Sequence, residues 1–135
     1  GKVVPRRDDS HLAHSIDLFP TLLSAAEIDD APLRNSLPGK NLMNPEEVAA
    51  RTQIFGEIYE HDVQEIGNPS SSLRYRWIID GDWKLIEPHR SVEAGGTTEL
   101  FRITADPDES QNLAETQPER VQTMRKSLDE WWKPE

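Results

Sequence analysis

The sequence of 135 residues has no cysteine and no long apolar run. Without cysteine it has no disulfide, no thiolate metal site and no cysteine nucleophile. A membrane-spanning helix needs about 18 or more consecutive apolar residues, so we expect no membrane span. The first twenty residues also lack the apolar core of a signal peptide.

Basic and apolar residues are both scarce. Asp and Glu number 25 against 15 Lys and Arg, which gives a formal net charge of −10. Such a surface repels phosphate backbones, so we expect no nucleic-acid partner. Apolar residues make up 35%, below the usual ~45–50%, which predicts a modest core to which four tryptophans contribute much. The length suits one domain, or one small domain plus a piece of another.

The first half predicts one helix among irregular segments. Residues 1–9 show no period and predict a loop. Asp17 is a good N-cap for a helix over 17–27 with one apolar side, and Pro20 is tolerated in its first turn. Residues 29–50 look irregular, apart from a brief helical turn capped by Asn44. The apolar side of the helix comprises Leu18, Phe19, Leu22, Leu23 and Ala26.

The second half predicts strands over 53–60 and 98–103, with a hairpin over 73–87 between them. A two-residue Asp80-Gly81 turn would scatter the apolar residues of the hairpin over both faces. We therefore favour a three-residue loop, since a one-residue slip inverts a strand. That register puts Arg76 and Lys84 on one face, and on the other Tyr75, Trp77, Trp83 and Leu85.

A final helix follows the capping box Thr116-Gln117-Pro118-Glu119. Its apolar residues recur at helical spacing: Val121, Met124, Leu128, and Trp131 or Trp132. Four strands in meander-like order with one amphipathic helix predict an α+β fold, a four-stranded antiparallel sheet packed against the C-terminal helix.

Several short motifs occur along the chain in a recognisable order. They are His14-Ser15-Ile16-Asp17-Leu18-Phe19-Pro20-Thr21-Leu22-Leu23, Pro38-Gly39-Lys40-Asn41-Leu42, Trp83-Lys84-Leu85-Ile86, Glu99-Leu100-Phe101-Arg102-Ile103, Asp106-Pro107-Asp108-Glu109 and Asn112-Leu113-Ala114. Together they cover nearly the whole chain and resemble the C-terminal portion of a sulfatase of the arylsulfatase-like, alkaline phosphatase superfamily type.

The resemblance implies a division of the chain. Residues 1–50 would be the trailing segment of an N-terminal α/β domain, and residues 51–135 the C-terminal subdomain. It also implies a parent enzyme that hydrolyses sulfate esters with a formylglycine, made from Cys or Ser in a Cys/Ser-x-Pro-x-Arg motif, beside a calcium ion. Those residues would all lie upstream, so we expect no catalytic residue and no metal ligand here, and no activity of the chain alone.

The partners implied are the chain's own N-terminal catalytic domain and a sulfated small molecule or carbohydrate. The resemblance is compatible with a periplasmic or secreted parent. Two other interpretations stay open: the C-terminal part of a related phosphonate or phosphodiester hydrolase, and a stand-alone binding or oligomerisation module.

The candidate substrate contacts lie at the end of the first predicted strand. In the family, this strand end and the loop after it can face the active-site cleft. His61 is the best single candidate, followed by Glu57 and Tyr59, because carboxylates, an aromatic ring and an imidazole can all contact a sugar. The alternative is an exposed edge strand with a polar loop.

Other candidate sites have weaker support. Ser36-Leu37-Pro38-Gly39-Lys40 imitates the formylglycine motif but has Lys where Arg is required. His11 and His14 lack a nearby carboxylate or third ligand for a metal. Arg74 and Arg76 could bind an anion, but pairing with carboxylates is favoured. For Trp77 and Trp83, core packing is favoured over sugar stacking.

Overall fold

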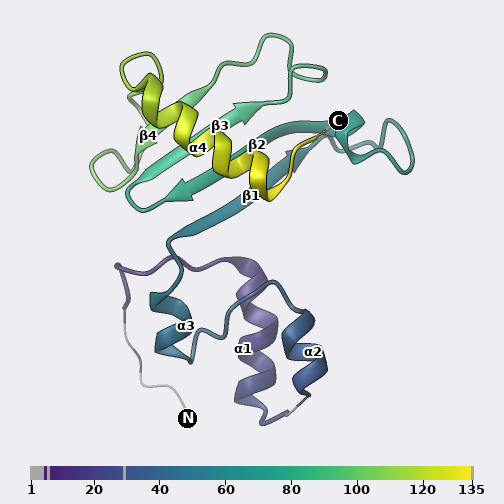
Figure 1. The fold of residues 1–135 in the computed structure, drawn as a ribbon, viewed down its shortest axis with the longest axis vertical. Helices are drawn as coiled ribbons and strands as arrows, with labels where there is room; N and C mark the ends of the chain where they lie inside the picture. The colour runs from purple at the N-terminus through teal and green to yellow at the C-terminus, as the bar shows by residue number, and fades with distance from the viewer. Residues whose placement is uncertain (1–4, 6, 29, 135) are drawn as a thin grey trace. The chain divides into compact units, whose positions relative to one another are not determined.

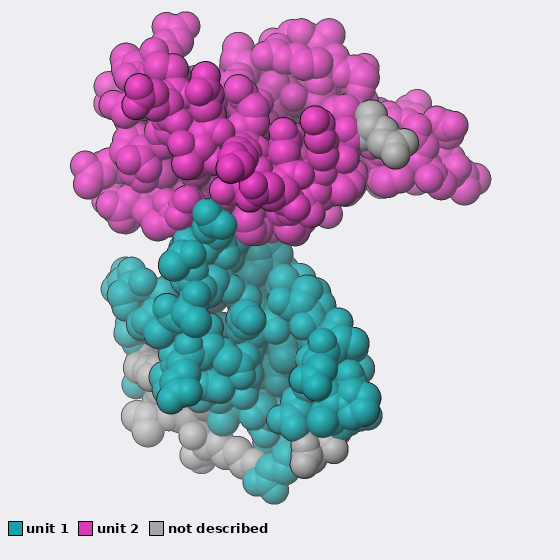
Figure 2. All heavy atoms as spheres, in the orientation of Figure 1, with its two compact units in different colours: residues 1–54 teal, residues 55–135 magenta. Residues whose placement is uncertain are grey.

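The computed structural model describes residues 5, 7–28 and 30–134. It divides into two compact units, Gly1–Ile54 and Phe55–Glu135, shown in different colours in Figure 2. The loop predicted for residues 1–9 falls partly outside the described residues, since 1–4 and 6 are not among them.

The first unit is built from short helices (Figure 1). They are the 3₁₀ turn η1 (Ser15–Asp17), α1 (Leu18–Ala25), α2 (Ala31–Ser36) and α3 (Pro45–Ala49). The predicted first helix and the turn capped by Asn44 are confirmed, because the Asn44 side chain accepts from the N–H groups of Glu46 and Glu47. The prediction that residues 29–50 are irregular was wrong at α2, which is a helix. There Asp30 accepts from the N–H of Leu33, and the proline in the first turn is compatible with a helix start.

Asp17 ties this unit together. It stands at the N-cap position of α1 but makes no side-chain cap to that helix, contrary to the prediction. Its fully buried carboxylate accepts instead from the N–H groups of His14 (2.7 Å) and Lys40 (2.8 Å). Arg51, whose side chain is 8% exposed, adds an ion pair through both guanidinium nitrogens. Burial alone would raise the pKa of Asp17, but Arg51 and the two backbone donors hold it below its ordinary value.

Thr21 and Gly39 hold the segment after α2 against α1. The Thr21 hydroxyl donates to the carbonyl of Asp17 (2.6 Å) and accepts from the N–H of Leu42 (2.9 Å). A Cβ at Gly39 would lie 2.2 Å from the carbonyl oxygen of Ile16. The Asp-Leu-Phe-Pro-Thr and Pro-Gly-Lys-Asn-Leu motifs are therefore structural, because their polar and glycine residues join two segments of one unit.

Gly39→Ala should destabilise the first unit by about 1–3 kcal/mol, the usual cost of overpacking. The added methyl group meets backbone atoms, which cannot rotate away. Hydrogen exchange of the peptide covering residues 13–25 would report the loss as lower protection. Gly95→Ala is the matched control, since nothing lies within 4 Å of its Cβ position. Equal exchange in the two variants would contradict this packing.

The apolar side predicted for α1 exists, but the structure leaves most of it open. Leu23 is buried, whereas Leu22 is 64% exposed. Leu18 and Phe19 on the same side are also exposed, as is Ile16 just before the helix. Monomeric proteins rarely leave a continuous apolar face in water. We call these four residues, Ile16, Leu18, Phe19 and Leu22, the α1 face.

The second unit is the predicted α+β fold (Figure 1). One antiparallel sheet has the order β1-β2-β3-β4, and α4 (Pro118–Trp131) packs against one face of it. The strands are β1 (Gln53–Tyr59), β2 (Leu73–Asp80), β3 (Trp83–Pro88) and β4 (Glu99–Arg102), with a 3₁₀ turn η2 (Pro69–Ser72) before β2. Within the described residues, no helix is long and apolar enough to cross a membrane.

The predicted hairpin register was wrong. Asp80 pairs with Trp83 and Ile78 with Leu85, so the turn is Gly81-Asp82. Gly81 has a φ of 54°, which glycine adopts at little cost. The predicted alternatives are a two-residue turn at Asp80-Gly81 and a three-residue loop. A two-residue turn at Gly81-Asp82 is also compatible with the sequence.

This register changes which residues face α4. Trp83 and Leu85 share the helix face as predicted, but Tyr75 and Trp77 lie on the opposite face with Lys84. Arg76 moves to the helix face, where it donates to Asp129 (2.9 Å) and to the carbonyls of Leu128 and Trp132. The core consists of Ile78, Leu85, Leu100, Val121, Met124 and Leu128.

The predicted capping box before α4 does not form. Gln117 is the N-cap residue and makes no side-chain cap hydrogen bond. The Thr116 hydroxyl donates instead to the carbonyl of Leu113 (3.1 Å). Pro118 at the first helical position begins the helix without that bond, since its missing N–H needs no partner there.

The loop between β4 and α4 is held by the remaining motifs. Lys84 donates to both carboxylate oxygens of Glu109, at 2.7 and 2.8 Å. Asn112 accepts from the N–H groups of Leu100 and Ala114. Asp106 accepts from the N–H groups of residues 110 and 111, which lowers its pKa below the ordinary value. The tryptophan-lysine, Asp-Pro-Asp-Glu and Asn-Leu motifs thus fix one loop to the sheet.

Candidate functional site

Glu57 and Tyr59 lie two residues apart on the outer half of the edge strand β1. Successive side chains of a strand point to opposite faces, so these two share a face with Phe55, which packs against the core under α4. Both are exposed. Partial burial of the Tyr59 phenol, and then the nearby charge of Glu57, raise its pKa. Tyr59 therefore remains a neutral hydrogen-bond donor at physiological pH.

His61 follows in the loop between β1 and β2, and its side chain is exposed. This loop is tied back on itself. The N–H of Gln64 donates to the Ser72 hydroxyl (2.9 Å), and the amide of Asn68 donates to the Glu65 carboxylate (2.9 Å). Ile66 is nevertheless 96% exposed.

The histidines near the N-terminus differ from the prediction in one respect. A carboxylate does lie near His11, because Nδ1 of His11 is 2.9 Å from Asp8. Hydrogen bonds from Ser10 and His11 lower the pKa of Asp8 to about 2. His14 accepts from the N–H of Ile16 and caps η1. In the described part of the chain, no three His, Cys, Asp or Glu side chains are placed to share a metal ion.

Ser10, His11 and Asp8 superficially resemble a hydrolase triad. The Ser10 hydroxyl lies 3.2 Å from Nδ1 of His11, and Asp8 contacts the same nitrogen. A triad uses the two ring nitrogens separately, one for the nucleophile and one for the carboxylate. These contacts therefore form a local turn, not a relay.

The other side chains considered from the sequence have structural partners. Ser36 is the last residue of α2, and its hydroxyl donates to the carbonyl of Leu33 (2.7 Å). Arg74 pairs with Glu93 and Arg76 with Asp129, as expected from the acidic composition. Trp83 packs on the core beneath the guanidinium of Arg120, 4.5 Å from the ring centre.

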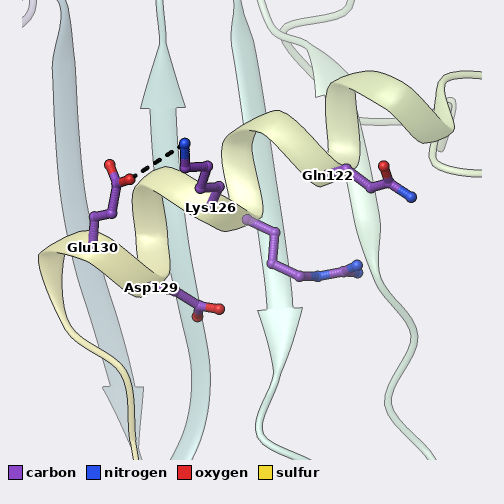
Figure 3. A pocket seen from close by; sticks show the side chains of 5 residues that line it. Gln122, Lys126, Asp129 and Glu130 are labelled. Atoms are coloured by element: carbon purple, nitrogen blue, oxygen red, sulfur yellow. Dashed lines mark ion pairs between the residues drawn. The ribbon is translucent and has the colours of Figure 1, made fainter.

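A shallow hollow lies on the outer side of α4 (Figure 3). Polar and charged residues line it, and Lys126 and Glu130 form an ion pair across one turn at 3.7 Å. Such an exposed pair contributes little and does not shape a ligand site. The lining residues are Gln122, Arg125, Lys126, Asp129 and Glu130.

Sequence reasoning missed one feature near Glu57 and Tyr59. Trp131, at the end of α4, stacks on Phe55 of β1 with ring centres 5.2 Å apart and an interplanar angle of 15°. Helical spacing had assigned Trp131 or Trp132 to the core, but Trp131 is 41% exposed. No signal in the sequence pairs residue 55 with residue 131, because the contact depends on how α4 crosses the sheet.

The chain is similar to known proteins that are described as sulfatases. No protein-family model matches. Arylsulfatase K of Xenopus laevis is 26% identical over 133 residues, which covers 94% of this chain and 23% of that protein. The chain thus spans about a quarter of the length of that relative.

Solved structures share the fold. One is yidJ of Bacteroides fragilis, assigned as a sulfatase, with a TM-score of 0.56 and 22% identity over 85% of this chain and 23% of that one. Another was solved with its substrate D-glucosamine-2-N,6-O-disulfate and has a TM-score of 0.51 and 20% identity, over 84% of this chain and 22% of that one. Both structural similarities support the same fold for this chain, that is, the same arrangement of helices and strands.

Proposed function

We propose, from the resemblance of this chain to the C-terminal portion of a sulfatase, that it is one part of a sulfuric ester hydrolase. In this proposal residues 1–50 complete the N-terminal α/β domain, and residues 51–135 form the C-terminal subdomain. The chain supplies scaffold and a wall of the substrate cleft, while the rest of the parent protein supplies the chemistry.

The α1 face is the observation that carries this proposal. Four apolar side chains in and just before a short helix are exposed to water. Burying a large apolar side chain contributes about 1.5–3 kcal/mol, so a partner surface over this face would gain several such contributions. The N-terminal catalytic domain of the parent is the partner that we propose to cover it.

Calcium and formylglycine belong elsewhere in the parent on this proposal. No described group of side chains fits a metal ion. The sequence has no cysteine, and the Ser36 hydroxyl is bound to a carbonyl of its own helix. Neither group therefore fits the described residues, and no reaction step is assigned to them.

The substrate class that we propose is a sulfated carbohydrate. A structural neighbour was solved with a disulfated glucosamine as its substrate. In this chain, Glu57, Tyr59 and His61 offer a carboxylate, a phenol and an imidazole along one strand end, all exposed. Hydroxyl groups of a sugar pair well with this set.

The chain by itself should not hydrolyse aryl sulfates, with or without calcium. It has no cysteine, and its single Ser-x-Pro stretch has Lys40 in place of the required arginine. The measurement is release of a chromogenic phenol above a buffer blank. Turnover that persists through repurification would contradict the proposal.

In the full-length parent, His61→Ala and Glu57→Ala should lower kcat/KM for the natural substrate but not for a small aryl sulfate, which is too short to reach the loop. Losing a hydrogen bond costs about 0.5–1.5 kcal/mol if both partners are neutral and about 1.5–3 if one is charged. The expected loss is roughly several-fold to hundredfold. The exposed Glu115→Ala is the control. Equal losses on both substrates would argue against substrate contact.

A further inference from the structure

The stacked pair of Phe55 and Trp131 lies partly in solvent, which core packing alone does not explain. Trp132 meets Trp131 edge-on, with ring centres 6.3 Å apart and an interplanar angle of 86°. Trp131 is therefore held between two aromatic rings, yet 41% of it remains exposed. Phe55 stacks on the indole and Trp132 contacts it edge-on, and the rest of its surface is open to solvent.

Polar and charged side chains lie on the two elements that carry this stack, β1 and α4. Glu57 and Tyr59 follow Phe55 on the same face of β1. Two residues of a strand span about 6.6 Å, and this distance separates each of these residues from the next. In α4, Asp129 and Glu130 precede Trp131, where they pair with Arg76 and Lys126, respectively. The centre of a protein–protein interface is depleted of charged residues, so a flat apolar protein surface is a poor match.

A sugar ring matches both features. Its C–H face is apolar and stacks on an aromatic ring, while its hydroxyl groups donate to carboxylates around the rim. The chain carries a net charge of −10, so this surface offers no attraction to a sulfate group. An uncharged ring fits better than a sulfated one.

We infer that Trp131, supported by Phe55, is a stacking platform for an uncharged sugar ring, with Glu57 and Tyr59 as hydrogen-bond partners of its hydroxyls. This inference rests on the proposed function for its ligand class, since a glycan substrate would place neutral rings beside the sulfated one. The platform would select longer glycans over single sugars.

Titration of the chain with a neutral tetrasaccharide of N-acetylglucosamine tests the platform. The four tryptophans give four indole N–H signals in an NMR spectrum. We expect saturable shifts of the Trp131 signal, with smaller ones for Trp132 and none for Trp83. Shifts spread over all four signals, or absent up to the solubility of the sugar, would overturn the inference.

Variants separate stacking from folding. Trp131→Leu keeps an apolar side chain and should weaken binding roughly tenfold, whereas Ile66→Ala should leave it unchanged. The remaining three indole signals of Trp131→Leu report whether the fold survives; if it does not, Trp131→Phe replaces it. Unchanged affinity in a folded Trp131 variant, or tighter binding of a sulfated tetrasaccharide, would refute the platform. Neither outcome bears on the parent reaction, which depends on residues outside this chain.

Discussion

Arg51→Ala should unfold much of the Gly1–Ile54 unit. The substitution leaves the fully buried carboxylate of Asp17 with two backbone donors and no countercharge. Breaking a buried ion pair by removing one partner costs about 3–5 kcal/mol, which is a large share of the stability of a unit this small.

Hydrogen exchange is the measurement that detects this loss of stability. Tryptophan fluorescence does not report on the first unit, because all four tryptophans lie after residue 54. Peptides covering residues 13–25 and 38–50 should lose protection, while tryptophan fluorescence stays as in the unsubstituted chain. Arg7→Ala, which breaks a pair exposed on both sides, is the matched control. Unchanged protection in Arg51→Ala would show that the pair does not hold the unit together.

Acid should act on the same contact. The folded-state pKa of Asp17 lies below its ordinary value, so the stability it contributes is present above that value. It is lost as the pH falls through the folded-state pKa. The protection factor of the 13–25 peptide, which compares its exchange with that of an unstructured peptide at the same pH, should accordingly fall at acid pH in the unsubstituted chain.

Arg76→Ala should strongly destabilise the Phe55–Glu135 unit. The guanidinium, 11% exposed, pairs with Asp129 and donates to the carbonyls of Leu128 and Trp132 at the end of α4. It therefore satisfies carbonyls that a helix end leaves open, and its charge complements the helix dipole. Allowing for the partial exposure of Asp129, we expect a loss of about 2–4 kcal/mol.

A thermal melt followed by tryptophan fluorescence measures this loss. The midpoint should fall by roughly 10 °C or more, since 1 kcal/mol corresponds to about 4–8 °C in a unit of this size. Arg102→Ala removes an exposed pair with Asp82 and should change little. A melt of Arg76→Ala that matches the Arg102 control would contradict the assigned contacts.

Arg76 shows what sequence reasoning could not reach. Strand limits, strand order and the apolar face of α4 could be predicted, because alternation and helical spacing are local. The hairpin register depended on whether the turn began at residue 80 or 81, and the one-residue difference moved Arg76 from the predicted solvent face to the helix face. From the sequence alone, its substitution would have been expected to be harmless.

The candidate site, like the fold, could be predicted from the sequence only in part. Glu57, Tyr59 and His61 could be proposed because the family resemblance implies that this strand end and its loop can face the active-site cleft, and their role stays a prediction. Trp131 could not, since its partner Phe55 lies 76 positions earlier and only the packing of α4 on the sheet brings the rings together. The motifs behind the family resemblance have structural roles at Asp17, Gly39, Lys84 and Asn112.

The central claim is that this chain belongs to a larger hydrolase whose chemistry lies upstream. Sequencing the genomic DNA before the codon for Gly1 tests it most directly. We predict an open reading frame that continues upstream and encodes a Cys/Ser-x-Pro-x-Arg motif a few hundred residues earlier, the distance implied by a chain that spans 23% of its relative. An in-frame start codon directly before Gly1, or a long upstream frame without that motif, would contradict the account.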